Sequence, residues 1–199
     1  MHISFGNKKL AKKVAIFNLP AIITCPGRTD LCNRICYANK PYVLYSKNVQ
    51  FSRQNNLWVS LQKDFAGRIT AFIRRKGVKL VRIHESGDFY SQKYLNKWII
   101  IALCNPGTLF LAYTRSRYLN FTHAPDNLLL RFSTDKTGFP IEKDGKMYTY
   151  MLDTGESLPP YLVGGHICNN QAAHRHYCGE SCLFCWTKGV TQNVIWARH

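Results

Sequence analysis

The chain has 199 residues, 46% of them hydrophobic and 13% aromatic, which fits a single folded domain and argues against disorder. It contains no apolar run long enough to span a membrane, and its polar first 13 residues do not resemble a signal peptide. We therefore expect a cytoplasmic protein. Lysine and arginine number 27 against 11 acidic residues, and this net charge of +16 favours nucleic acid as a partner. A phosphorylated small substrate or a merely solubilising basic surface would give the same charge.

Strands and helices are predicted to alternate along the chain. Residues 1–13 are expected to form a basic N-terminal arm, and residues 14–199 a single α/β domain. Such alternation is typical of parallel strands joined by helices. We favour a short, incomplete (β/α) barrel, with an open doubly wound sheet as the alternative. In chain order, the predicted elements are a β-leaning stretch at 14–24, mostly helix over 40–77, a strand at 78–83, a helix at 91–103, strands at 109–113 and 128–132, and a β-leaning stretch at 147–152.

Four of the eight cysteines stand close together, in the order Cys168-x9-Cys178-x3-Cys182-x2-Cys185. In a reducing compartment, cysteines at such spacing are more typical of metal ligands than of disulfides. Thiolates select iron–sulfur clusters or zinc. A zinc ribbon normally has two C-x2-C pairs, whereas this segment has one, so we favour a 4Fe-4S cluster over zinc. His166 lies just before this segment, and His174 and His176 lie between Cys168 and Cys178. Histidine replaces cysteine at some zinc and Rieske-type centres, but we interpret His174 and His176 as parts of a basic loop.

The C-x3-C-x2-C triad at the end of this segment resembles the signature of radical S-adenosylmethionine enzymes. It departs from that signature because it lies late in the chain and because Cys168 supplies a fourth ligand, which would leave no open iron. A second group comprises Cys25, Cys32 and Cys36. It would hold a cubane with one open iron, bind zinc with an added histidine, or contribute core residues. The two groups would also be able to share one centre. Cys104 stands apart and is expected in the core.

Polar side chains follow three of the predicted strands, at the edge where parallel α/β folds build their sites. His84, Glu85 and Asp88 follow one strand, Arg115 the next, and Asp135 the third. Carboxylates and a histidine suit general acid–base chemistry, and arginine suits a phosphate or carboxylate clamp. Gly87 would bring backbone amides close to a ligand. The alternative for Asp88 is a structural role as the cap of the following helix.

Three stretches together resemble the gene-product-eighty-eight family of phage proteins: Thr24 through Ala38, Arg82 through Ser91, and Cys178 through Trp186. The closing stretch Val194 to His199 is similar as well. The resemblance implies a phage or prophage origin, an iron–sulfur centre and a barrel similar to that of radical S-adenosylmethionine proteins. It also adds weight to Tyr37, beside Gly87 and Asp135, as a cofactor-binding residue.

Three hypotheses follow. The first is an iron–sulfur protein that binds nucleic acid, with the cluster on Cys168, Cys178, Cys182 and Cys185. The second is an enzyme, in which Cys25, Cys32 and Cys36 hold an open-site cluster and His84, Glu85, Asp88 and Arg115 surround S-adenosylmethionine and a substrate. The third is a zinc-stabilised module that binds a host protein. The sequence leaves open whether the protein is an enzyme.

Overall fold

The computed structural model describes residues 1–142, 146–168 and 177–197. Its centre is an eight-stranded sheet in the order β1-β2-β3-β4-β5-β6-β8-β7. All neighbouring strands run parallel except β1 and β2, which are antiparallel. The strands are β1 (Ser4–Phe5), β2 (Val14–Phe17), β3 (Leu80–Ile83), β4 (Leu109–Thr114), β5 (Leu128–Asp135), β6 (Tyr148–Leu152), β7 (His166–Ile167) and β8 (Val194–Ala197).

The helices lie mainly in the first half of the chain: α1 (Asp30–Ile35), α2 (Pro41–Leu44), α3 (Lys47–Leu61), α4 (Phe65–Lys76) and α5 (Gln92–Cys104). Short 3-10 turns lie at Tyr37–Asn39, Pro160–Leu162 and Phe184–Trp186, the last of them labelled η3. The prediction of mostly helix over 40–77 is confirmed, with interruptions at residues 45–46 and 62–64. Helix α4 ends at Gly77, whose φ of 60° is the left-handed conformation that favours glycine.

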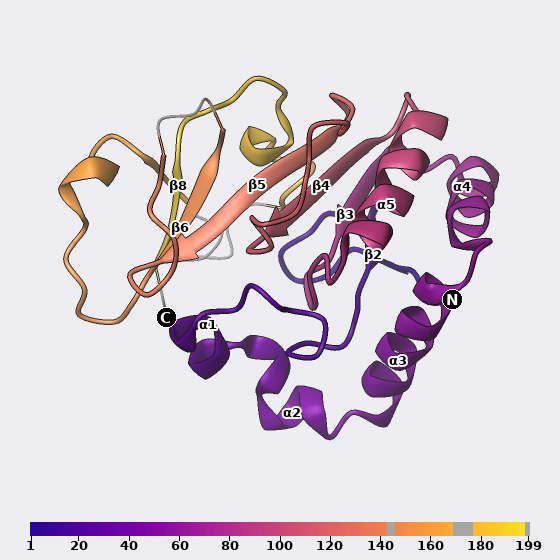
Figure 1. Cartoon of the computed structure of the whole chain (residues 1–199), viewed down its shortest axis with the longest axis horizontal. Helices are drawn as coiled ribbons and strands as arrows, with labels where there is room; N and C mark the ends of the chain where they lie inside the picture. The colour runs from indigo at the N-terminus through magenta and orange to yellow at the C-terminus, as the bar shows by residue number, and fades with distance from the viewer. Residues whose placement is uncertain (143–145, 169–176, 198–199) are drawn as a thin grey trace.

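One face of the sheet is covered by helices, and most of the hydrophobic core lies there. Side chains alternate along each strand, so Phe17, Ile83 and Phe110 point toward α4 and α5. They meet Phe65 and Trp98 from those helices, with Trp98 packed edge-on against both Phe17 and Phe65. This is the arrangement expected of βαβ units (Figure 1).

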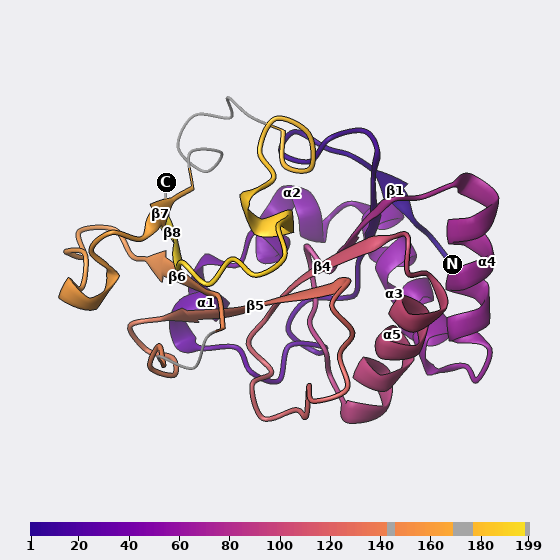
Figure 2. The same ribbon diagram turned by 90° about the horizontal axis from the view of Figure 1, so that it is seen from above.

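The opposite face is covered by the cysteine-rich segment. Val14, Ile16 and Leu111 point to this side, and they pack with Leu10 and with Trp186 of η3. Figure 2 shows η3 on the side of β4 and β5 that is opposite α5. In the described residues of this segment the longest helical element is the short turn η3, and it lies where a doubly wound fold has a second helical layer.

The predicted barrel is not confirmed, because the described strands form an open sheet with β1 and β7 at its edges. Strand–helix alternation holds from β2 to β4, but the described chain between β4 and β5 contains no helix. What the structure establishes is a mixed α/β fold with a mostly parallel sheet. The predicted N-terminal arm is partly built into it: β1 pairs with β2, and Leu10 and Ala11 are buried, while Lys8, Lys12 and Lys13 are exposed.

Candidate metal centre

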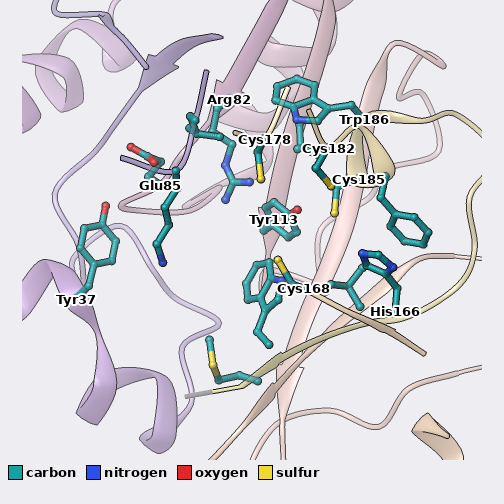
Figure 3. Close-up of a pocket in the computed structure, with 17 residues that line it drawn as sticks. Tyr37, Arg82, Glu85, Tyr113, His166, Cys168, Cys178, Cys182, Cys185 and Trp186 are labelled. Atoms are coloured by element: carbon teal, nitrogen blue, oxygen red, sulfur yellow. The ribbon is translucent and has the colours of Figure 1, made fainter. Parts of the chain in front are cut away.

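Four cysteines line one pocket on the face opposite α4 and α5. They are Cys168, Cys178, Cys182 and Cys185, the group predicted to bind metal, and the pocket has a volume of about 270 Å³. In Figure 3 the side chains of Cys178, Cys182 and Cys185 lie together above Tyr113, and that of Cys168 lies below it. The structure thus places all four cysteines of this segment around the same cavity.

The backbone around Cys178 joins the cysteine segment to the first residues of the fold. Its amide donates to the Lys9 carbonyl at 2.9 Å, and its carbonyl accepts from the Ala11 amide at 3.0 Å. The next residue, Gly179, has a φ of 88°, and a Cβ placed there would lie 2.7 Å from Cγ2 of Val14. Only glycine combines this backbone conformation with so close an approach to the sheet.

Two other cysteines of the site, Cys185 and Cys168, are hydrogen-bonded to strands of the sheet. The carbonyl of Cys185 accepts hydrogen bonds from Nε and Nη2 of Arg131 on β5, at 3.1 and 2.8 Å. Cys168 directly follows β7, and its amide donates to the Ile195 carbonyl of β8 at 3.0 Å. Strands β5, β7 and β8 therefore position these two cysteines, while Cys182 is held by the Gly179 amide, which donates to its carbonyl at 2.9 Å.

Burial raises the pKa of the Cys185 thiol to about 11, with a further contribution from Cys168, while a hydrogen bond from Tyr113 and the charge of Arg131 oppose the shift. The thiol is therefore protonated at neutral pH when no cation is bound. Metal binding to such a site releases protons and becomes tighter as the pH rises.

The donor set fits a soft metal in its chemistry and in its gathering around one cavity. Within the described residues, however, no three His, Cys, Asp or Glu side chains are grouped closely enough to enclose an ion. His166 also lines the pocket and stacks on Phe184 with ring centres 4.0 Å apart. His174 and His176 lie outside the described residues.

Aromatic and basic side chains line the pocket among the cysteines. The Arg82 guanidinium lies 3.9 Å from the centre of the Tyr113 ring, and Tyr113 contacts Trp196 at 4.7 Å between ring centres. These three residues were not assigned to the site from the sequence. The signal that would have found them is the strand alternation, since they point to the same face as Leu80, Leu111 and Val194. Glu85 and Tyr37, predicted as catalytic and cofactor-binding residues, do line this pocket.

The cysteines at 25, 32 and 36 do not line the pocket but lie at the carboxyl edge of the sheet. Thr29 caps α1 by accepting from the Cys32 amide at 3.1 Å, and its hydroxyl donates to Asp135 at 2.5 Å. Burial raises the pKa of Cys25 to about 12, and the charges of Asp88, Cys32 and Cys36 add to this shift. Two separate groups of thiols therefore exist, each with its own surroundings.

Asp88, Arg115 and Asp135 lie together at this edge, where they bind one another and the loops. Asp88 accepts from the Thr114 hydroxyl at 2.6 Å and from the Arg115 amide at 2.8 Å. Burial raises its pKa to about 6 even though these hydrogen bonds favour the carboxylate. The Arg115 guanidinium pairs with Asp135 at 2.8 Å, and both side chains are largely buried. The helix cap proposed for Asp88 is supplied instead by Ser91, which accepts from the Tyr94 amide.

Two further predicted site residues are enclosed by the protein. His84 is buried on the helix-covered face, where its Nε2 lies 2.8 Å from the Tyr94 hydroxyl. Its φ of 60° turns the ring away from the pocket that Glu85 lines. A Cβ on Gly87 would lie 2.6 Å from Cβ of Leu19, so this glycine permits close packing of two loops. Neither residue faces the cysteine-lined pocket in this structure.

Together these features define a mixed α/β protein with a cysteine-lined pocket on the face of a mostly parallel sheet that lies opposite α4 and α5. The chain belongs to the Gene product 88 family, whose sequence profile matches residues 1–188. The Gene 88 protein of Mycobacterium phage L5 is 33% identical over 160 residues, and that of Mycobacterium phage D29 is 31% identical over 159 residues. Each match covers 72% of this chain and 66% of the relative, just under two thirds of its length.

No solved structure gives a significant match to the chain. Nor is any helix in the described part of the chain both long and apolar enough to cross a bilayer.

Proposed function

We propose that this phage-type protein holds an iron–sulfur centre on Cys168, Cys178, Cys182 and Cys185. The observation that carries the proposal is the convergence of these four thiols on one pocket. The backbones of Cys168, Cys178 and Cys185 are hydrogen-bonded to β8, to the segment around Leu10 and to β5, which supports a fixed position for these cysteines around the pocket.

The charges around the pocket support a centre built from thiolates. Four thiolates concentrate negative charge in a small volume, and Arg82 and Arg131 lie where they offset it. A bound cluster would supply redox chemistry or a structural crosslink between the segments that carry the thiols. Arg131 would act on the centre through the carbonyl of Cys185, which it already holds in position.

The second part of the proposal is that the protein binds nucleic acid in the host cytoplasm. The net charge of +16 supports this part, because an excess of cations attracts the phosphate backbone. Binding through phosphate contacts releases counterions, so we expect affinity to fall steeply as salt is raised. Binding that does not change with salt, or no binding to DNA or RNA, would remove this part and leave the metal centre in place.

The test of the metal centre is to purify the protein without oxygen and measure iron, sulfide and zinc per chain. We expect a brown protein with equal iron and sulfide, about four of each per chain for one cubane. Cys185→Ser and Cys168→Ser should each lose most of the iron, whereas Cys104→Ser, an exposed position on α5, should retain it. A colourless protein with one zinc and no iron would refute the iron–sulfur proposal and favour the zinc-stabilised module that binds a host protein.

A second candidate function concerns the thiols at the carboxyl edge of the sheet. Cys25, Cys32 and Cys36 are near enough to influence one another electrostatically, and parallel α/β folds place their sites at this edge. Three thiols would leave one iron of a cubane open to S-adenosylmethionine. Calorimetry on the reduced, reconstituted protein tests this candidate: Cys32→Ala should abolish the heat of binding, and a flat titration of the unmodified protein would reject it.

A further inference from the structure

Helix α3 turns aromatic side chains to the solvent and polar ones to the core. Its buried positions include Arg53, Asn56 and Ser60. The Asn56 amide donates to the carbonyls of His2 and Asn18 at 2.8 and 3.0 Å, and the Ser60 hydroxyl lies 2.9 Å from that of Tyr90. The inner face of the helix is therefore attached by these hydrogen bonds together with Val59 and Leu57, which pack in the core, whereas Phe51 and Trp58 take no part in the core cluster.

The outer face of α3 carries a continuous stripe. All of its members are exposed, and their spacing of four and three residues places them on one side of the helix: Lys47, Phe51, Gln54, Trp58 and Leu61. Phe51 is 74% exposed and Trp58 is 58% exposed. The two rings are separated by seven residues, or about 10 Å along the helix axis. On α2 and just after it, Tyr42 and Tyr45 add two more exposed rings, 71% and 84%.

The charge of this region selects the partner. No aspartate or glutamate occurs between Leu31 and Lys63, whereas Lys40, Lys47 and Lys63 do. A second copy of the chain would bring another +16 to the surface and would be repelled. A polyanion with flat apolar groups matches both the cations and the rings. Single-stranded nucleic acid has that chemistry, because its unpaired bases stack on aromatic side chains while its phosphates contact lysines.

We propose that the aromatic stripe of α3, together with Tyr42 and Tyr45 of the α2 region, binds single-stranded nucleic acid by base stacking. In Figure 1, α2 and α3 lie at the margin of the molecule, away from the covered faces of the sheet. A nucleic-acid strand can therefore reach them. The inference rests on the nucleic-acid part of the proposed function and names the surface and the kind of strand. It does not depend on the metal centre.

The test measures fluorescence anisotropy of a labelled 20-nucleotide oligothymidine strand with the full chain. Phe51→Ala combined with Trp58→Ala should raise Kd about tenfold or more, because stacking is lost while every charge remains. Phe51→Tyr combined with Trp58→Phe should keep Kd within about threefold of the unmodified protein, since the rings are retained. The control is Ile100→Ala with Leu103→Ala, which removes exposed apolar groups from α5 and should leave Kd unchanged. Circular dichroism verifies the fold of each variant.

Three outcomes would overturn the inference, and they are distinguishable. The first outcome is that the unmodified protein binds the oligothymidine with strong salt dependence but the variant with Phe51→Ala and Trp58→Ala has the same Kd. The aromatic stripe is then not the nucleic-acid surface, and a protein becomes its expected partner. If the alanine pair weakens a duplex of the same length equally, base stacking is wrong, because paired bases do not present their faces. If the unmodified protein binds no nucleic acid at all, the nucleic-acid part of the proposed function fails as well, and the iron content of the protein still decides the metal centre.

Discussion

On the helix-covered face of the sheet, Phe17, Phe65 and Trp98 fill the space between strands and helices and interlock edge to face. On the other face, the cysteine segment contacts the sheet through Leu10, Trp186 and main-chain hydrogen bonds, and it leaves a pocket. The first face is stabilised by its own packing. The described part of the second face has a smaller apolar cluster, and four cysteines line its pocket. The comparison teaches that the larger apolar core and the cysteine-lined pocket lie on opposite faces of the sheet, so each face can be tested separately.

The largest effect is expected from Trp98→Ala on the helix-covered face. Removing a fully buried tryptophan leaves a cavity among Phe17, Phe65 and Phe110, so the free energy of unfolding should fall by about 3–5 kcal/mol. Denaturant titration followed by circular dichroism measures it. Trp58→Ala on the exposed stripe is the matched control and should cost less than about 0.5 kcal/mol. Equal losses for both variants would contradict the assignment of the core to this face.

Gly179→Ala probes the attachment of the cysteine segment to the other face. An added Cβ would meet Val14 and would sit at a φ of 88°, so we expect a loss of about 2–4 kcal/mol and a lower metal content. Gly155→Ala is the matched control, because Gly155 also has a positive φ but nothing lies within 4 Å of its Cβ position. It should cost about 1 kcal/mol and leave the metal content unchanged. Thermal unfolding and metal analysis measure both variants. Equal stability and equal metal content in Gly179→Ala and Gly155→Ala would refute the attachment at Gly179.

The buried His84 should make the helix-covered face sensitive to acid. Burial, with a contribution from the charge of Arg82, lowers the pKa of His84 from 6.5 to about 3. Below pH 6.5 the unfolded chain takes up a proton that the folded chain does not, so stability is complete above this pH and is lost as the pH falls toward 3. At pH 5 the loss is about 2 kcal/mol.

His84→Asn tests this prediction, since asparagine tolerates the positive φ and does not titrate. The free energy of unfolding is measured at pH 7 and at pH 5. Its decrease between the two should be about 2 kcal/mol smaller in His84→Asn than in the unmodified protein. His2→Asn, at an exposed histidine, should keep the full difference. An unchanged pH dependence in His84→Asn would show that the ring is not held neutral in the core.

The smallest effect is expected from Cys104→Ser. The sequence predicts Cys104 in the core, but the structure exposes it near the end of α5, because its position points away from the sheet. A serine there should change the free energy of unfolding by less than about 0.5 kcal/mol. Urea titration checks it. A loss above about 1 kcal/mol would contradict the exposed position of Cys104 and indicate that its side chain is buried.

Much of the fold was predictable because apolar periodicity marks the main elements. The strands at 78–83 and 109–113 and the helix at 91–103 correspond to β3, β4 and α5. The short strands β1 and β7 were missed, since two residues carry no periodicity. Strand β8 was not predicted as a strand, although the closing stretch from Val194 to His199 formed part of the family resemblance. Strand β5 continues to Asp135, so the polar residues expected after it form its last positions.

The site was predictable in its cysteines and less so in its other residues. The spacing of the four late cysteines predicted a common metal site, which stays a prediction; in the structure all four line one pocket. The position of His84 was not predictable, because one residue with positive φ reverses the side on which a ring emerges. We expected three charged residues at the carboxyl edge of the sheet, Asp88, Arg115 and Asp135, to face a ligand. In the structure Arg115 pairs with Asp135, and the two carboxylates accept hydrogen bonds from Thr114 and Thr29. Local sequence does not show which partners a polar group finds after folding.

The bridge between Leu10 and Cys178 also has a consequence for the order in which the protein folds. The helix-covered face is built from residues before about 130, which can pack as soon as they leave the ribosome. The pocket cannot close until residues far along the chain have been synthesised and have returned to residue 10, a long loop closure that slows folding. Formation of the pocket is therefore a late step, and a metal centre would be inserted into a protein whose core has already formed.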